Sequence, residues 1–505
     1  MKLRFEYLFY FCCLMTFSGF FILRLFIVAS KGTDIAGIEQ NVIYSIQTLM
    51  DNGRLYTSPS TAPFAITQYT PIYYYICGFT AKIFGYEAYD VQRLYWIGRS
   101  WDILFNLITA CIIYRIGTAI LSLSKYKSFF LLVLTFTLTM SHNFAVRPDS
   151  LTDMLGIASI YCYMRYYQQE EKHKRSDLRL LLTVLLTALA VFTKQSGIQL
   201  ILIFGLFTLL LKDWLTTAKL LVFSILIYGG MLFLFMHLYS SFLENVVGGI
   251  ANGISIPNFI SVITKTIVIV SVWPLALLSL FLLFRNNLLL KGSIPERILA
   301  TCTLGSLVFA TMTALKMGST PQYYILFVNL SLLLVMNSFQ RHSTYKYRLP
   351  AYCYLALMIL AYGISATKLL MYNDHNQSLE KQRESANQTA AFIKKDQQNI
   401  EKKYIFSNVT TDTTIPSRQS LNNIFFKNCL VPQMDILEYS TGPSKVVGYQ
   451  NLENLIRKGK VEYIIESAPQ SKFILLTRLE SIKTAKFHLV KQIDGYLIYK
   501  LLPNQ

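Results

Sequence analysis

The sequence has 505 residues, of which 53% are hydrophobic and only 15% are charged. One soluble core cannot bury that much apolar surface, so the composition excludes an ordinary soluble protein and indicates that a bilayer is the solvent. The formal net charge of +19 would suggest nucleic-acid binding in a soluble protein, but in a membrane protein it reports topology. We therefore expect no nucleic-acid partner.

Apolar runs predict about eleven transmembrane helices, because a helix needs about 20 residues to cross the hydrocarbon. The first run follows Lys2 and Arg4, is too long for a signal peptide and lacks a convincing cleavage site, so we expect a retained anchor. The predicted spans lie near residues 7–30, 94–121, 128–145, 150–167, 179–194, 197–211, 219–239, 259–284, 297–315, 322–339 and 349–371.

Loop charge predicts the orientation of these spans. Basic residues gather in every second connection, and by the positive-inside rule those connections face the cytoplasm together with the N-terminus. The other connections are poor in charge and face outward, as does the chain after residue 373. The basic residues concerned are Lys125, Lys127, Lys172, Lys174, Arg175, Arg179, Lys212, Lys219, Arg285, Lys291, Arg297, Arg341, Lys346 and Arg348. We expect a multi-pass protein of the plasma (inner) membrane.

The segment 31–93 is too long for a simple outer loop. Ile35–Met50 has helical spacing of its apolar residues, and Pro71–Phe84 is apolar and aromatic but short. If the second stretch spanned the bilayer, the orientation of every later loop would invert. We therefore expect both stretches to be amphipathic helices lying along the outer interface, a depth that suits their tyrosines.

Polar composition marks residues 374–505 as an extracytoplasmic domain, separate from a membrane domain at 1–373. Short strands alternate there with helices, which predicts a small α/β fold. The strongest local signal is Asp494-Gly495 between two apolar runs, because Asp-Gly suits the type I′ turn of a β-hairpin. The expected elements are a helix at 377–395, a strand at 402–407, a helix at 452–458, a strand at 461–466, and a hairpin of 487–493 with 496–501.

The cysteines predict neither a disulfide framework nor a metal cluster. Seven of the eight lie in apolar runs, and Cys429 is isolated in the polar tail. No spacing among them matches a known ligand pattern. We therefore expect no metal site built from protein thiols.

Ionisable groups at the outward face are the candidates for chemistry, because a charge at membrane depth is costly. Two acids follow the first span, Asp34 and Glu39. Arg147-Pro148-Asp149 opens the fourth span, and Lys194 and Lys316 lie in later outer connections. Carboxylates beside cations suit a transfer from a lipid phosphate, since an acid accepts the proton of an attacking hydroxyl and fixed cations stabilise the departing phosphate.

Several short motifs occur in the order and spacing of a known family over residues 1–340. They are Gly32-Thr33-Asp34-Ile35, Gly53-Arg54-Leu55-Tyr56, Tyr69-Thr70-Pro71-Ile72-Tyr73-Tyr74, Arg147-Pro148-Asp149, Thr193-Lys194-Gln195-Ser196-Gly197 and Gln322-Tyr323-Tyr324-Ile325-Leu326. Together they resemble the GT-C class of membrane glycosyltransferases, which includes protein O-mannosyltransferases and lipid A aminoarabinose transferases that use polyprenyl-phosphate sugars. Many members have Asp-Glu at the first motif, whereas Ile35 follows Asp34 here, so the second carboxylate is either absent or supplied by Glu39.

The resemblance implies roles for individual residues. Asp34 would be the general base that deprotonates the acceptor hydroxyl, and Asp149 would orient the acceptor or hold a divalent cation with Asp34. Each Asp could instead simply cap the helix that follows it. Lys194, Lys316 and Arg147 would bind the donor phosphate, although lysines at the ends of spans also extend to lipid headgroups. Gln322, Tyr323 and Tyr324 would line the donor site, or the tyrosines would anchor the interface.

The sequence thus predicts a GT-C-like enzyme that transfers a monosaccharide from a polyprenyl phosphate to a hydroxyl of a glycan, lipid or protein with inversion. A transporter or lipid flippase is the first alternative, because charges within a helical bundle also mark transport pathways. A non-catalytic assembly protein, with the tail as a binding module, is the second. Neither the sugar nor the acceptor is specified by these residues.

Overall fold

The computed structural model describes residues 2–30, 39–139, 145–168, 176–341, 354–364, 376–396, 404–409, 418–432, 449–467 and 474–502. The chain divides into two compact units. The first, here called the helical unit, consists of Met1–Ala29, Arg99–Leu234 and Ile254–Leu370. The second, called the sheet unit, consists of Ser30–Gly98, Phe235–Gly253 and Met371–Gln505.

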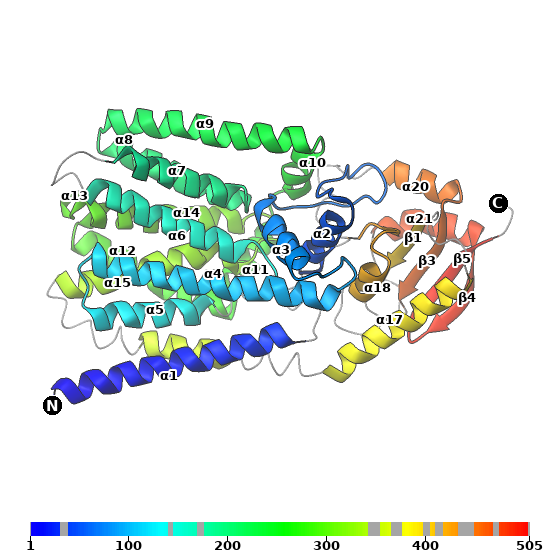
Figure 1. Ribbon diagram of the computed structural model, residues 1–505, viewed down its shortest axis with the longest axis horizontal. Coiled ribbons are helices and arrows are strands. Elements are labelled where there is room, and N and C mark those ends of the chain that lie inside the picture. Colours follow the sequence, from blue (N-terminus) through cyan, green and yellow to red (C-terminus); the bar gives the residue numbers. More distant parts are fainter. Residues whose placement is uncertain are drawn as a thin grey trace. The chain divides into compact units, whose positions relative to one another are not determined.

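The helical unit is a bundle in which α14 and α15 pack against each other, and both contact α6 (Figure 1). In the same bundle α5 and α12 contact α15, and α7 contacts α6 and α8. Its helices are α1 (Lys2–Ala29), α4 (Val91–Ala119, from Arg99 onward), α5 (Lys125–Thr139), α6 (Asp149–Gln168), α7 (Asp177–Val191), α8 (Ile198–Leu210), α9 (Trp214–Leu238, up to Leu234), α11 (Ile256–Ile263), α12 (Trp273–Arg285), α13 (Leu288–Lys291), α14 (Ile294–Ala314), α15 (Ile325–Arg341) and the helix Tyr354–Ile364, with short turns η2 (Gln195–Gly197), η4 (Val268–Val272) and η5 (Pro321–Tyr324).

Six of the described helices are long and apolar enough to cross a membrane. Their apolar surface differs in exposure, since only 11% of the apolar window in α9 is buried against 89% of that in α15. An exposed, wholly apolar helix such as α9 is stable only in lipid, while α15 forms the centre of the bundle. The six spans are Tyr7–Ala29, Val91–Ala119, Trp214–Leu238, Val268–Arg285, Ile294–Ala314 and Pro321–Arg341.

The chain is therefore a multi-pass membrane protein. The predicted count of eleven spans is not confirmed, because over the described residues the other predicted spans coincide with shorter or more polar helices. These are α5, α6, α7, α8 and the helix Tyr354–Ile364. Small residues allow them to pack closely: a Cβ atom on Gly156 of α6 would lie 2.9 Å from Cδ1 of Leu200 in α8, an approach that only glycine permits without repacking.

The sheet unit contains a five-stranded sheet of order β2-β1-β3-β5-β4. The pairs β1–β2 and β1–β3 are parallel, whereas β3–β5 and β4–β5 are antiparallel. The elements of this unit are α2 (Glu39–Asn52), α3 (Ile72–Ile83), α10 (Phe242–Val246), η3 (Gly248–Ile250), α17 (Asn376–Asp396), β1 (Tyr404–Asn408), α18 (Arg418–Ile424), β2 (Cys429–Leu430), α20 (Tyr449–Arg457), β3 (Val461–Ser467), α21 (Ile474–Lys486), β4 (Phe487–Ile493) and β5 (Tyr496–Leu501).

The predicted hairpin is confirmed at its strands and at its turn. β4 pairs with β5 from Phe487 opposite Leu501 to Ile493 opposite Tyr496. Asp494 and Gly495 both have positive φ angles, 44° and 86°. Two successive residues in this region are what a type I′ turn requires. The expected helices and strands of the tail correspond to α17, β1, α20 and β3.

Helices cover both faces of the sheet. Successive strand residues point to opposite sides, and the apolar ones on each side pack against helices. Phe406 and Ile464 pack with Leu452 of α20 and Leu479 of α21 on one face. On the other face, residues from β1 and β3 pack with α17, α18 and two residues of α2, Tyr44 and Met50. This second cluster includes Ile405, Tyr463, Ala390, Leu421 and Tyr44. The C-terminal sheet therefore shares a core with the segment after the first span.

This shared core corrects the expectation that α2 lies along the membrane interface with one face exposed. Ten of its fourteen residues are buried, including the polar Gln40 and Gln47. Gln40 donates to the carbonyl of Pro432, and Gln47 donates to the carbonyl of Ala88. The helix is buried because it packs on α3 and on the cluster around the sheet. A boundary at residue 373 between a membrane domain and an extracytoplasmic domain stays a prediction, although the sheet unit also takes in 30–98 and 235–253.

Candidate active site

Asp149 is the acidic centre of the candidate site and is the first residue of α6. Its Oδ1 lies 2.5 Å from Nζ of Lys194, and its Oδ2 lies 3.3 Å from Nε of Arg147. All three side chains are buried, with exposed fractions of 8% or less. One carboxylate thus faces a cation on each side. Removal from water strengthens such ion pairs but makes an unpaired charge very costly.

Lys194 reaches Asp149 because the chain turns sharply between α7 and α8. The amide of Lys194 donates to the carbonyl of Ala190, and the amide of Gly197 donates to the carbonyl of Lys194, each at 2.9 Å. A Cβ atom on Gly197 would lie 2.6 Å from the carbonyl carbon of Ala190, so the turn requires glycine there. Nζ of Lys194 also lies 4.5 Å from the ring centroid of Tyr323, a cation–π contact.

Lys316 belongs to the connection between α14 and α15. Its backbone forms an antiparallel bridge with Ile254, and its carbonyl accepts a 2.9 Å hydrogen bond from Nδ2 of Asn258. Burial, together with the charge of Lys194, lowers the pKa of Lys316 from 10.5 to about 8. The charge of Lys194 acts on Lys316, so the two ammonium groups belong to one positive region.

Gln322, Tyr323 and Tyr324 belong to the turn η5 before α15, in the same unit. Tyr323 covers Lys194, as described. Tyr324 is buried, donates to Thr311 at 3.4 Å and packs edge-on against Trp273. Gln322 accepts a hydrogen bond from Thr320. Tyr323 is therefore in direct contact with the cluster, whereas the contacts of Tyr324 and Gln322 are local.

The cluster of Arg147, Asp149, Lys194 and Lys316 carries three positive charges and one negative charge. An excess of fixed cations in a buried setting attracts an anion such as a phosphate. Asp149 itself is a poor divalent-cation ligand here, because Lys194 and Arg147 occupy its two oxygens and would repel a metal ion. The idea that it holds a divalent cation is not supported by this geometry, and its evident role is to position the two cations.

Of the two predicted acids of the first outer segment, the structure describes only Glu39. Asp34 lies outside the described residues. Glu39 begins α2 and is fully buried in the sheet unit. Among the residues that the structure describes, no group of three or more His, Cys, Asp or Glu side chains is suited to hold a metal ion.

A second buried polar group lies in the helical unit, and the sequence motifs do not indicate it. Arg24 of α1 is buried, donates to Oγ1 of Thr139 at 2.8 Å and stacks on the ring of Phe136 at 4.7 Å. It also interacts electrostatically with the buried Asp102 of α4. The available signal was an arginine within an apolar span, which requires a partner, but spacing alone does not reveal which one.

Comparison with solved structures places this cluster on a known architecture. ArnT from Cupriavidus metallidurans bound to undecaprenyl phosphate matches with a TM-score of 0.60 and 11% identity, covering 100% of this chain and 99% of ArnT. The chain has the GT-C fold. The oligosaccharyltransferase AglB from Archaeoglobus fulgidus, in complex with an inhibitory peptide and a dolichol-phosphate, matches with a TM-score of 0.51 and 11% identity, covering 97% of this chain and 74% of AglB.

ArnT without ligand gives a TM-score of 0.56 at 12% identity, over 99% of this chain and 98% of that one. The likeness to GT-C glycosyltransferases that the motifs suggested is therefore confirmed at the level of the fold. No protein-family model and no curated protein matches the sequence. At such low identity, activity must be argued from the residues of this chain.

Proposed function

We propose that this protein is a glycosyltransferase that transfers a monosaccharide from a polyprenyl-phosphate donor to an acceptor hydroxyl with inversion at the anomeric carbon. The observation that carries the proposal is the buried Asp149 flanked by Lys194 and Arg147, with the half-buried Lys316 as a third cation, on a GT-C fold. Only an anionic group neutralises that excess charge, and a phosphate does so with good hydrogen-bonding geometry.

The lipid donor is supported by the ligands of the similar structures. One ArnT structure is bound to undecaprenyl phosphate and one AglB structure is in complex with a dolichol-phosphate. Both ligands combine a phosphate with a long apolar chain. The helical unit offers an apolar exterior for such a chain and a buried cationic cluster for the phosphate. The acceptor is a hydroxyl of a cell-envelope glycan, a lipid or a protein.

The reaction is a single displacement. The acceptor oxygen forms a bond to the anomeric carbon while the bond from that carbon to the phosphate oxygen breaks. Asp34 accepts the hydroxyl proton. Lys194, Arg147 and Lys316 stabilise the charge that develops on the departing polyprenyl phosphate. Tyr323 covers Lys194 and limits water there, and Asp149 holds Lys194 and Arg147 in place.

The topology proposed for this function has eleven spans, a cytoplasmic N-terminus and an extracytoplasmic C-terminal domain in the plasma membrane. The alternation of basic and charge-poor loops supports it. It places Asp34, Arg147, Asp149, Lys194 and Lys316 at one membrane face, where a flipped lipid-linked sugar and an external acceptor meet.

The test is a transfer assay in sealed vesicles that contain the full-length protein. A radiolabelled polyprenyl-phosphate sugar is supplied with cell-envelope extract, and covalent transfer to acceptor is measured alongside movement of label across the membrane. We expect covalent transfer, and a loss of roughly 10²-fold or more for Lys194→Gln, the range seen when one charge-stabilising donor is removed. Lys219→Gln, which alters an exposed pair with Asp177, is the matched control and should retain full activity.

Two outcomes would overturn the proposal. Label that crosses the membrane without covalent transfer would identify a transporter or flippase. Equal transfer by the Lys194→Gln and Lys219→Gln variants would remove the cationic cluster from the mechanism.

A further inference from the structure

Helix α3 has one buried face and one exposed apolar face. The buried side packs on α2 and includes Tyr73, Tyr74, Cys77, Gly78 and Ala81. The other side carries a row of large apolar side chains, with exposed fractions of 36% for Tyr75, 67% for Phe79, 65% for Ile83 and 63% for Phe84. Positions 75, 79 and 83 follow each other at intervals of about one helical turn, so these side chains lie on one face of the helix. A row of this kind marks a surface that meets a protein partner or a membrane.

Two hydrogen bonds connect α3 to two of the membrane spans. The hydroxyl of Tyr73 donates to the carbonyl of Gly98 in α4 at 3.4 Å. The hydroxyls of Tyr75 and Tyr239 are hydrogen-bonded to each other, and Tyr239 directly follows the last residue of α9. All four residues belong to the sheet unit. The lengths of α4 and α9 therefore show how near α3 lies to the hydrocarbon.

The length of α4 limits where the hydrocarbon can begin. Its 29 residues form a helix about 43 Å long, whereas the hydrocarbon is about 30 Å thick. Only about 13 Å of this helix, or about nine residues, can lie outside the hydrocarbon. The hydrocarbon therefore begins no later than about nine residues after Val91. Gly98 is the seventh residue after Val91.

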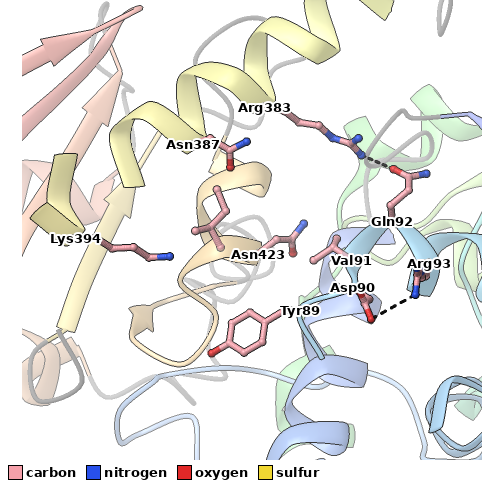
Figure 2. Close-up of a pocket in the computed structure, with 10 residues that line it drawn as sticks. Tyr89, Asp90, Val91, Gln92, Arg93, Arg383, Asn387, Lys394 and Asn423 are labelled. Carbon is pink, nitrogen blue, oxygen red and sulfur yellow. Dashed lines mark hydrogen bonds and ion pairs between the residues drawn. The ribbon is translucent and has the colours of Figure 1, made fainter. Parts of the chain in front are cut away.

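Polar contacts keep the first turn of α4 in water. Arg93 and Asp90 form an ion pair at 4.0 Å, and both side chains are exposed. Gln92 accepts a hydrogen bond from Arg383 of α17 (Figure 2). A charged side chain in hydrocarbon costs roughly 3 kcal/mol or more, so the boundary lies beyond Arg93. Gly98 is the fifth residue after Arg93 and thus lies within about 8 Å of the boundary.

The end of α9 gives an independent measure. Its 25 residues form a helix about 37 Å long, which exceeds the hydrocarbon by only about 7 Å. Tyr239 follows this helix directly, so it lies within about 9 Å of the boundary. Trp96 of α4 is 42% exposed and suits the same level, because tryptophan favours the membrane interface. Both hydrogen bonds therefore put the start of α3 beside the hydrocarbon.

We propose that α3 lies in the lipid leaflet beside the start of α4 and the end of α9, with Phe79, Ile83 and Phe84 inserted between the headgroups and the acyl chains. Lipid is the partner because the exposed row begins at the level of the hydrocarbon. Lys82, the one charged residue of α3, fits this position, since a lysine stem can follow apolar surface while its ammonium reaches lipid phosphates.

This contact gives the sheet unit a membrane attachment of its own, in addition to the transmembrane spans. The interfacial position that the sequence predicted for two segments is thereby proposed for α3 alone, with its lipid-facing side chains specified. The inference goes beyond the proposed transfer reaction, because none of these residues belongs to the Asp149 cluster.

The test is photo-crosslinking of the full-length protein in liposomes of phosphatidylethanolamine and phosphatidylglycerol. The photoreactive residue p-benzoylphenylalanine replaces Phe79 in one variant, Ile83 in a second and Leu489 in a third. Leu489 is the matched control, because it is 51% exposed in β4, at the opposite end of the sheet unit from α3 (Figure 1). After irradiation, intact-protein mass spectrometry measures the fraction of the chain that carries a phospholipid.

We expect at least tenfold more phospholipid adduct at Phe79 and at Ile83 than at Leu489. The assay contains no sugar donor, so its result is independent of the transfer reaction. Equal adduct at the three positions would overturn the proposal. Crosslinks from Phe79 and Ile83 to a second copy of this chain, in place of lipid, would overturn it as well and would identify this face as a protein interface.

Discussion

Nζ of Lys194 and Oδ1 of Asp149 lie 2.5 Å apart, although 45 residues separate them along the chain. Both side chains are almost wholly buried. The contact joins the start of α6 to the turn between α7 and α8, and α6 and α7 pack along each other. The ion pair therefore holds α6 to the turn after α7 and also positions a charge in the candidate site.

Asp149→Asn should destabilise the protein by about 3–5 kcal/mol, because it leaves two buried cations without their shared carboxylate. Thermal unfolding in detergent measures the change. Adding Lys194→Met should restore part of the loss, since the double variant no longer buries the unpaired ammonium. Asp177→Asn is the control: its pair with Lys219 has a similar distance, 2.7 Å, but is exposed, so about 1 kcal/mol or less is expected. Equal losses for the two variants would contradict the ion-pair assignment.

Donor binding should weaken as pH rises through 8. The pKa of Lys316 is lowered to about 8, so its ammonium is protonated below that pH and neutral above it. If Lys316 binds the donor phosphate, KM for the donor rises between pH 7 and pH 9. Lys316→Arg keeps the charge to much higher pH and should move this rise above pH 10. A rise at the same pH in the variant would assign the titration to another group.

Asp34→Asn should lower kcat by about 10²–10⁴-fold, the usual contribution of a general base. KM for the lipid donor should change little, because the cations that bind the phosphate are intact. The measurement is the initial rate of label transfer in vesicles at saturating donor. Asp177→Asn again serves as the control. A variant that transfers sugar at the unmodified rate would show that another group takes the proton.

Gly495→Ala should destabilise the β4–β5 hairpin by about 1–2 kcal/mol, because the residue has φ of +86° and an added Cβ disfavours that region. Hydrogen–deuterium exchange of β4 and β5 should accelerate, while exchange in the helical unit is unchanged. Gly229→Ala in α9 is the comparison: it lies in a helix with open space around it, so the same substitution there should be neutral or stabilising. Unchanged exchange in the hairpin would argue against a strained turn.

The predictions that the structure confirms rest on patterns within a few neighbouring residues. The Asp494-Gly495 turn follows from the backbone preferences of two residues, and its strands follow from the flanking runs. The expected helix Pro71–Phe84 agrees with α3 to within one residue at each end. Its run of apolar and aromatic residues is a local signal that marks those ends directly. The motif Thr193–Gly197 was chosen for its resemblance alone, and the sharp turn that requires Gly197 is seen only in the structure.

Contacts between segments that are distant in the sequence could not be predicted from such local patterns. The burial of α2 against β1 and β3 could not be predicted, because its helical spacing suits a lipid interface and a protein core equally well. The partner of Arg24 was hidden for the same reason, since an arginine in a span shows that a partner exists but not where it lies.

The sequence by itself determined that the chain needs a bilayer, where its apolar helices lie, and which ionisable residues are candidates for chemistry, because hydropathy, turn preference and charge act over a few residues. Only the tertiary structure decided that Lys194 and Arg147 share Asp149, and that the tail and the segment 39–98 build one core. Those features arise when packing brings distant segments within a few ångströms, and at that range charge and hydrogen bonding act between residues that the chain order keeps apart.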